Sequence, residues 1–290
     1  MNRLNSLHLT KNLNRHESDH KGHSGKVLVI GGSISMSGSI ILAGLGALYS
    51  GAGWVKLIAL DPAFPHLIPE YPELMIYSAQ TLAPLELLKT IKPDVIIIGP
   101  GLAQNDISKS WLLAAIEYYA PLVIDADGLN LLANHPELTE LIHERFWTTI
   151  LTPHPGEASR LLNKSCEEIQ KNRSHALHQM IEMYNSIIVL KGHKTLLGMK
   201  SEPMLTCFDG NPGMACAGMG DVLAGAIGSL VAQSLFHHLT PWQACCLAVE
   251  IHALAGDSFV RKGYGPIGMT PSELSKEMRF ILNRALSQIG

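Results

Sequence analysis

The sequence of 290 residues lacks the features that mark secreted, membrane and nucleic-acid-binding proteins. It has five cysteines with no CxxC spacing, so we expect neither a disulfide framework nor a structural zinc site. No apolar run reaches the roughly 18 residues needed to span a bilayer. The polar N-terminus lacks the apolar core of a signal peptide. The formal net charge is −3 with no block of lysine or arginine, which argues against nucleic acid or a membrane as partner. We therefore expect a cytoplasmic protein whose cysteines are reduced core residues.

What the chain does contain is a regular alternation of strand-like and helix-like patterns. Hydrophobic residues make up 47% of it, enough for one large domain. From residue 26 onward, short β-branched runs alternate with helical spacing, and the runs within 94–99 and 121–125 are continuously apolar. Such runs fit strands buried on both faces of a parallel sheet. We predict an α/β fold of three layers (α/β/α) with a mainly parallel sheet. The simplest division is an N-terminal arm over 1–24 and one domain over 25–290.

Five of the predicted strands end in polar or glycine-rich segments, namely GGS, GPGL, DADG, TPHPGE and KG. Ligands of parallel sheets bind beyond the carboxyl ends of the strands. These segments are therefore expected to form one functional rim. The first contains no GxGxxG and no P-loop pattern. It is either a plain turn between strand and helix or, through Gly31, Gly32, Gly38 and Ser39, a flat floor for a bulky ligand.

The segment GNPGMACAGMGDVLAG over 210–225 places one carboxylate, Asp221, where glycines give way to an apolar helix. Backbone N–H groups at such a helix start bind anions, and Gly218 and Gly220 permit close approach. One interpretation makes Asp221 an ordinary N-cap. The other makes it a base that takes a proton from a hydroxyl attacking phosphorus. In that case we expect the helix end to hold its pKa low, which phosphoryl transfer tolerates.

Other polar residues at the predicted rim each admit two interpretations. His154 is either a substrate ligand or a surface residue, and Glu157 either holds Mg²⁺ or simply favours a helix start. Lys191 either pairs with a nucleotide phosphate or is a solvated strand-end lysine. Asp127 is expected to be a helix cap. We expect the remaining histidine pairs and clusters to be surface residues: His16, His20, His23, His237 and His238.

Taken in order, the segments HKGHSGKVLVIGGS, GAGWVKL, IIIGPGL, LVIDADGLNLL, LTPHPGEASRLL, VLKGHKT and GNPGMACAGMGDVLAG closely resemble the NAD(P)H-hydrate dehydratases. That family belongs to the ribokinase-like superfamily, and the resemblance runs from about His20 to the C-terminal helices. It implies a ribokinase-like fold. It also implies repair of hydrated NADH and NADPH. In that reaction the ring hydroxyl of the S-epimer is phosphorylated, phosphate is eliminated, and AMP is released when ADP is the donor.

The resemblance further implies Mg²⁺ and ADP, or ATP, as phosphoryl donor. It implies a homo-oligomer, which we guess to be a tetramer. Many bacterial relatives carry a fused epimerase domain, whereas about 25 residues precede the first strand here. We therefore expect a stand-alone dehydratase with any epimerase on a separate chain.

Family positions transfer to this sequence residue by residue. Asp221 matches the catalytic aspartate, and Glu157 is a candidate metal ligand. The hydrate-binding positions are Ser39, Gly101, His154 and Asp221. The nucleotide-binding positions are Lys191, Gly192, His193, Lys194, Thr195, Gly218 and Gly220.

The chain departs from the family pattern at five loop positions. Met219 stands where Thr or Ser is typical, so a side-chain contact to phosphate is expected to be missing while the backbone N–H remains. Cys216 and Ala217 replace Thr and Gly, Met36 replaces Tyr, and Ser39 replaces Ala and adds a hydroxyl at the hydrate site. These departures bear on affinity and nucleotide preference.

Two rival functions remain open. A small-molecule alcohol kinase of the same superfamily, of the hydroxymethylpyrimidine or hydroxyethylthiazole type, would share the fold, but such kinases usually have Asn at the position of His154. A non-catalytic protein that senses or buffers adenine nucleotides would not need the base Asp221.

Overall fold

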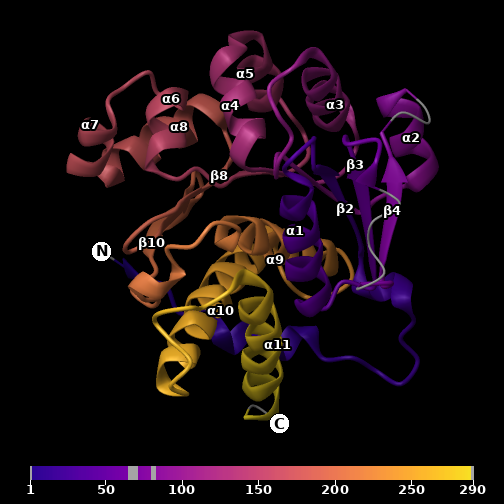
Figure 1. Ribbon diagram of the computed structural model, residues 1–290. Coiled ribbons are helices and arrows are strands. Elements are labelled where there is room, and N and C mark those ends of the chain that lie inside the picture. Colours follow the sequence, from indigo (N-terminus) through magenta and orange to yellow (C-terminus); the bar gives the residue numbers. More distant parts are fainter. Residues whose placement is uncertain (1, 65–70, 80–82, 289–290) are drawn as a thin grey trace.

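In the computed structural model, which describes residues 2–64, 71–79 and 83–288, a twisted sheet runs through the middle of the molecule (Figure 1). Its ten strands lie in the order β1-β10-β9-β8-β7-β6-β5-β2-β3-β4. Among these described strands, β9 alone runs against the others. The strands are β1 (Asn2–Arg3), β2 (Lys26–Gly31), β3 (Trp54–Ala59), β4 (Leu74–Ser78), β5 (Val95–Ile98), β6 (Leu122–Ile124), β7 (Thr149–Leu151), β8 (Ile187–Leu190), β9 (Leu196–Met199) and β10 (Glu202–Thr206).

Helices cover both faces of the sheet, which confirms the predicted three-layer α/β/α fold (Figure 1). One face packs against α1 (Ser37–Tyr49), α9 (Met219–Ser234), α10 (Pro241–Arg261) and α11 (Pro271–Ser287). The other packs against α2 (Pro84–Ile91), α3 (Asp106–Glu117), α4 (Ala126–Asn134), α5 (Pro136–His143), α6 (Pro155–Leu161), α7 (Cys166–Lys171) and α8 (Arg173–Tyr184). Successive strand residues alternate between the two cores. Val27 and Val29 face the first, and Leu28 and Ile30 face the second. Burial on both faces explains why the strands read as continuous apolar runs.

Two central helices, α1 and α9, cross in very close contact. A Cβ on Gly225 would lie 1.9 Å from the carbonyl oxygen of Ala43, and one on Gly46 would lie 2.2 Å from that of Val222. Neither position has room for a side chain, so glycine sets the separation of the two helices. This contact brings the first turn of α1, with Ser39, next to the first turn of α9, with Asp221.

The N-terminal segment lies against the domain. β1 pairs in parallel with β10, and the 3₁₀ helices η1 (Leu7–Leu13) and η2 (Lys21–Ser24) follow it. Leu4 is buried, and the Ser6 hydroxyl donates to a Glu250 carboxylate oxygen over 2.6 Å. Arg3 pairs with Asp209 at 3.0 Å. These contacts tie the start of the chain to α10 and to the segment that leads into the glycine-rich loop.

Two sequence-based expectations about composition can be compared with the structure. All five cysteines are free, but Cys166 and Cys216 are exposed, so the prediction that the cysteines are core residues holds only for Cys207, Cys245 and Cys246. Within the described ranges, no helix is both long enough and apolar enough to cross a membrane.

Candidate functional site

The five strand ends expected to form a rim do come together. β8, β7, β6, β5 and β2 are consecutive and parallel in the sheet, so their carboxyl ends meet at one edge. The first two loops are joined by hydrogen bonds: Gly32 N–H donates to Pro100 O over 3.0 Å, and Ser33 N–H donates to Gly101 O over 2.7 Å. A Cβ on Gly31 would lie 2.0 Å from Pro100 O, so this close approach requires glycine.

The predicted hydrate positions Ser39, Gly101 and Asp221 lie side by side. Gly101 has a φ of 58°, and a Cβ there would meet Met36 O at 2.6 Å and Ser39 Cβ at 3.3 Å. The Ser39 side chain in turn forms a hydrogen bond that lowers the pKa of Asp221. The hydroxyl that distinguishes this chain from the family pattern therefore contacts the candidate base directly.

A buried ion pair, Asp125 with Lys191, lies at the centre of the rim. Lys191 Nζ is 2.6 Å from Asp125 Oδ1 and 3.9 Å from Glu157 Oε2, and the Thr152 hydroxyl donates to Asp125 Oδ1 over 2.7 Å. The Asp125 side chain is only 2% exposed and that of Lys191 16%. Burial alone would lower the pKa of the Lys191 ammonium, but the charges of Asp125 and Glu157 outweigh it and raise that pKa. Lys191 is therefore a fixed positive charge.

Asp221 is the third residue of α9, and Gly218, with a φ of 92°, is the N-cap. The interpretation of Asp221 as a cap is therefore wrong. Lys191 Nζ would lie 3.3 Å from a Cβ on the neighbouring Gly220. The N–H groups of Gly220 and Asp221 have no acceptor within the described part of the chain, as expected at an uncapped helix start. A positive side chain and unpaired N–H donors thus meet at one point, which suits an anion.

The expectation of a low pKa for Asp221 is wrong. Burial, with the negative charge of Asp125 as the second cause, raises the pKa of Asp221 to about 7, against the opposing effects of Lys191 and Ser39. Loss of solvent outweighs the helix end because the overlying α1 and the ion pair leave the carboxylate little water. A carboxylate with this pKa is matched to proton transfer near neutral pH.

His154 and Glu157 form the start of α6. His154 Nδ1 accepts the N–H of Gly156 at 2.9 Å, and Glu157 Oε2 accepts the His154 N–H at 2.7 Å. His154 Nε2 lies 3.3 Å from Glu157 Oε1, so both carboxylate oxygens already have partners. Burial raises the pKa of Glu157 to about 7. Glu157 is thus a helix-capping residue at the rim. Both nitrogens of the His154 ring have partners within this capping arrangement, and the ring itself is half exposed.

The nucleotide positions 191–195 form the turn between β8 and β9. Arg173 holds this turn by donating to the carbonyls of Leu190 at 2.9 Å, Lys191 at 3.2 Å and His193 at 3.1 Å. Lys194, with a φ of 59°, places its ammonium 5.7 Å from the ring centre of Phe208. Glycine is needed at 192, where φ is 132° and a Cβ would meet Arg173.

Met219 does not face the anion-binding point. Its side chain is 4% exposed and packs in the core shared by α9 and α10. The N–H of Met219, which we expected to be free for phosphate, donates to Cys216 O over 3.3 Å. Within the part of the chain that the structure describes, the free N–H groups of this turn are those of Gly220 and Asp221. The side chain at 219 therefore belongs to the packing below the loop and not to the anion-binding point.

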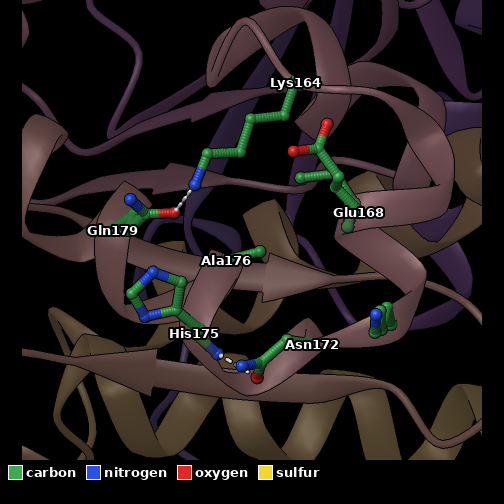
Figure 2. Close-up of a pocket in the computed structure, with 8 residues that line it drawn as sticks. Lys164, Glu168, Asn172, His175, Ala176 and Gln179 are labelled. Atoms are coloured by element: carbon green, nitrogen blue, oxygen red, sulfur yellow. Dashed lines mark hydrogen bonds between the residues drawn. The ribbon is translucent and has the colours of Figure 1, made fainter.

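Two surface hollows lie away from the rim. One, of about 380 Å³, lies between α7 and α8, as Figure 2 shows, and is lined by Lys164, Glu168, Ile169, Lys171, Asn172, His175, Ala176 and Gln179. The other, of about 550 Å³, brings together His16, His23, His237 and His238 beside Asp19. Over the described ranges, no three His, Cys, Asp or Glu side chains are grouped to hold a metal. None of the predicted site residues lines either hollow.

The sequence analysis did not predict Asp125 and Thr152 as site residues. Their positions at the ends of strands were the only signal that could have identified them. Asp127 was also misjudged, since it is not a cap: its Oδ2 accepts the Ala103 N–H at 2.9 Å and so holds the GPGL loop. Asp125 occupies the N-cap position of α4, but its side chain makes no capping hydrogen bond. It bonds to Lys191 instead.

Comparison with known proteins agrees with this geometry. A family model described as NAD(P)H-hydrate dehydratase matches residues 27–279. The ADP-dependent (S)-NAD(P)H-hydrate dehydratase of Neisseria meningitidis is 34% identical over 93% of this chain and 89% of its own length. The bifunctional NAD(P)H-hydrate repair enzyme of Coxiella burnetii is 42% identical over 91% of this chain. The match covers 51% of that relative, so this chain spans about half of its length. The ADP/ATP-dependent NAD(P)H-hydrate dehydratase of Bacillus subtilis, co-crystallised with ATP and Mg²⁺, superimposes with a TM-score of 0.79 at 26% identity and covers 100% of this chain and 99% of its own. The chain therefore belongs to the NAD(P)H-hydrate dehydratase family.

Proposed function

We propose that this protein is an ADP-dependent dehydratase that restores NADH and NADPH from their hydrates, acting on the S-epimer. The observation that carries the proposal is Asp221, a partly buried carboxylate with a pKa of about 7 beside unpaired N–H donors and the ammonium of Lys191. The names of the relatives support the substrate, and the Neisseria name supports ADP as donor.

In the proposed first step, the ring hydroxyl of the hydrate attacks the terminal phosphorus of ADP and Asp221 accepts its proton. An oxygen–phosphorus bond forms, the bond from phosphorus to the AMP oxygen breaks, and AMP leaves. The N–H groups of Gly220 and Asp221, with Lys191, stabilise the charge on the transferring phosphoryl group. In the second step the carbon–oxygen bond breaks, phosphate leaves with the bonding electrons, and a neighbouring ring proton passes to water, which restores the double bond.

The phosphoryl chemistry implies Mg²⁺, which would neutralise phosphate charge. Mg²⁺ is commonly held by one or two carboxylates together with substrate phosphates and water. The described residues fit that pattern in part, since they include no group of three His, Cys, Asp or Glu side chains that could hold a metal. Glu157 remains the candidate ligand. Because both of its carboxylate oxygens already have partners, it would hold Mg²⁺ through a water molecule. Most of the ligands would then come from the nucleotide.

For the hydrate itself, Ser39, Gly101 and His154 are proposed to line the site around Asp221. Gly101 lets this loop lie against the start of α1, because a Cβ there would meet Met36 and Ser39. For the adenine nucleotide, the turn over 191–195 and the glycines at 218 and 220 are proposed as the binding surface. Assembly as a homo-oligomer and a separate epimerase stay predictions.

The family match favours dehydration over the alcohol-kinase alternative. The test mixes the protein with hydrated NADH, Mg²⁺ and either ADP or ATP, and follows the near-ultraviolet absorbance of the reduced ring together with released phosphate. We expect the absorbance to return with ADP, with AMP and free phosphate as products, and not with Asp221→Asn. A stable phosphorylated alcohol without returning absorbance would show a kinase instead. Nucleotide binding without any turnover would show a binding protein.

A further inference from the structure

One face of α10 contacts the glycine-rich loop at three points along its length. At the start of the loop, Asp257 Oδ2 accepts the Gly210 N–H at 2.9 Å, and Asp257 Oδ1 accepts Asn211 Nδ2–H at 3.2 Å. In the middle, Gly256 packs against Met214, whose sulfur would lie 2.4 Å from a Cβ at that position. At the end, His252 Nε2 lies 3.1 Å from Met219 O. Residues 252 and 256 lie one turn apart on the same side of α10, and 257 follows at the edge of that side.

The contact at Asp257 continues into the turn of the loop. Asn211 Oδ1 accepts the Gly213 N–H at 3.0 Å and caps the short 3₁₀ helix η4 (Pro212–Met214). The amide of Asn211 is therefore fixed at both ends, with its NH₂ on Asp257 and its oxygen on Gly213. The two oxygens of the Asp257 carboxylate accept from the Gly210 N–H and from the Asn211 amide at once. This chain of bonds sets the path of the segment that leads to Gly218 and Gly220.

The contact at His252 fixes the other end of the loop. His252 is 8% exposed, and burial lowers the pKa of its imidazole to about 4. The ring is therefore neutral at physiological pH, and Nε2 donates its single proton to Met219 O. Met219 is the first residue of α9, so this bond fixes the turn that carries Gly220 and Asp221.

We propose that Asp257 and His252 are positioning residues, which hold the anion-binding turn 210–221 in the geometry that receives the nucleotide phosphate. This inference rests on the proposed function, because the turn is assigned there to nucleotide binding and proton transfer. Neither residue is required to touch a ligand. Their effect would reach the reacting groups through Asn211 and Met219.

The pair of Asp257 and Asn211 allows a sharp test by exchange. In Asp257→Asn, the NH₂ groups of two amides face one another, so the contact has two donors and no acceptor. In Asn211→Asp, two carboxylates face one another, so it has two acceptors and no donor. In the double variant, the amide at 257 still accepts from Gly210 and donates to position 211, whose carboxylate still accepts from Gly213. The double variant thus restores all of these hydrogen bonds, with the single negative charge moved from position 257 to position 211.

We expect each single variant to weaken ADP binding and raise the KM for ADP roughly tenfold, and the double variant to return most of the way to wild type. The dissociation constant for ADP is measured by calorimetry and the KM by the absorbance assay, with the melting temperature followed in parallel. Glu137→Gln is the matched control, since it makes the same exchange in an exposed ion pair with Lys109 on the other side of the sheet. Unchanged ADP binding in the single variants, or a double variant no better than either, would overturn the proposal.

His252 is tested by a pair of replacements. Glutamine can still donate to Met219 O, whereas phenylalanine fills the space without a donor. We expect His252→Gln to keep a lower KM for ADP than His252→Phe, and equal losses in both would argue against positioning by this bond. If the wild type binds ADP without restoring NADH, the dehydratase function fails while the calorimetric comparison still decides this inference. If the wild type does not bind ADP, both fail.

Discussion

Replacing Asp125 by asparagine should lower the pKa of Asp221 and shift the acidic limb of the pH–rate profile. The amide oxygen can still accept from both Thr152 Oγ1 and Lys191 Nζ, which bond to the same atom, Oδ1, so the change removes charge and little else. Without the carboxylate, the ammonium of Lys191 acts more strongly on Asp221. Both effects favour ionised Asp221.

The magnitude follows from the causes of the shift. The rise in the pKa of Asp221 from 3.8 to about 7 corresponds to about 4 kcal/mol. Burial is the largest cause and Asp125 the second, so removing the charge should recover part of the rise, on the order of one pKa unit.

The assay is kcat/KM for hydrated NADH with saturating ADP, measured from pH 5 to 9. Because the base must be ionised, the wild-type rate should fall as the pH drops through about 7. In Asp125→Asn that fall should come about one unit lower, while Glu137→Gln should follow the wild type. An acidic limb near pH 4 in the wild type, or one that does not move in Asp125→Asn, would refute the reasoning.

Three further predictions follow from the same geometry. Ser39→Ala removes a hydrogen bond that lowers the pKa of Asp221, so its acidic limb should move to higher pH; a limb that moves the other way would contradict the contact. Lys191→Met leaves buried carboxylates without their counter-charge and should cost about 3–5 kcal/mol of unfolding free energy at pH 8. The cost in urea titrations should shrink at pH 5, where Glu157 and Asp221, both with pKa values of about 7, are protonated, and an equal cost at both pH values would argue against it. Gly225→Ala, whose Cβ would lie 1.9 Å from Ala43 O, should lower the free energy of unfolding by about 3 kcal/mol or more. Gly38→Ala, with nothing within 4 Å, should stay within about 1 kcal/mol of wild type, so equal melting temperatures for the two would contradict the close crossing of α1 and α9.

The sequence predicted the layers and the rim because both follow from local patterns. Continuous apolar runs such as 95–98 identify strands buried on both faces, and a parallel sheet gathers the loops after such strands at one edge. Asp221 was located for the same reason, since glycines followed by an apolar run mark a helix start.

The charge state of the site could not be predicted in this way. The pKa of Asp221 depends on how deeply α1 covers it and on Asp125, which lies 96 residues earlier in the chain. The ion pair of Asp125 with Lys191 likewise depends on β6, β7 and β8 being neighbours, which no local pattern states. The contacts of His252 and Asp257 with the loop arise from the packing of α10 and had no signal in their own neighbourhood.

The edge position of β1 has a practical consequence for preparing the protein. β1 is the outermost strand of the sheet, and Arg3 is bonded to Asp209, the residue before Gly210 (Figure 1). An affinity tag fused at the amino terminus would begin two residues before Arg3, whose ion pair with Asp209 holds the segment that leads into the loop proposed to bind ADP. α11 ends away from this edge, so a carboxyl-terminal tag leaves it clear. Affinities and rates for this protein are best measured with the tag at the carboxyl end or removed.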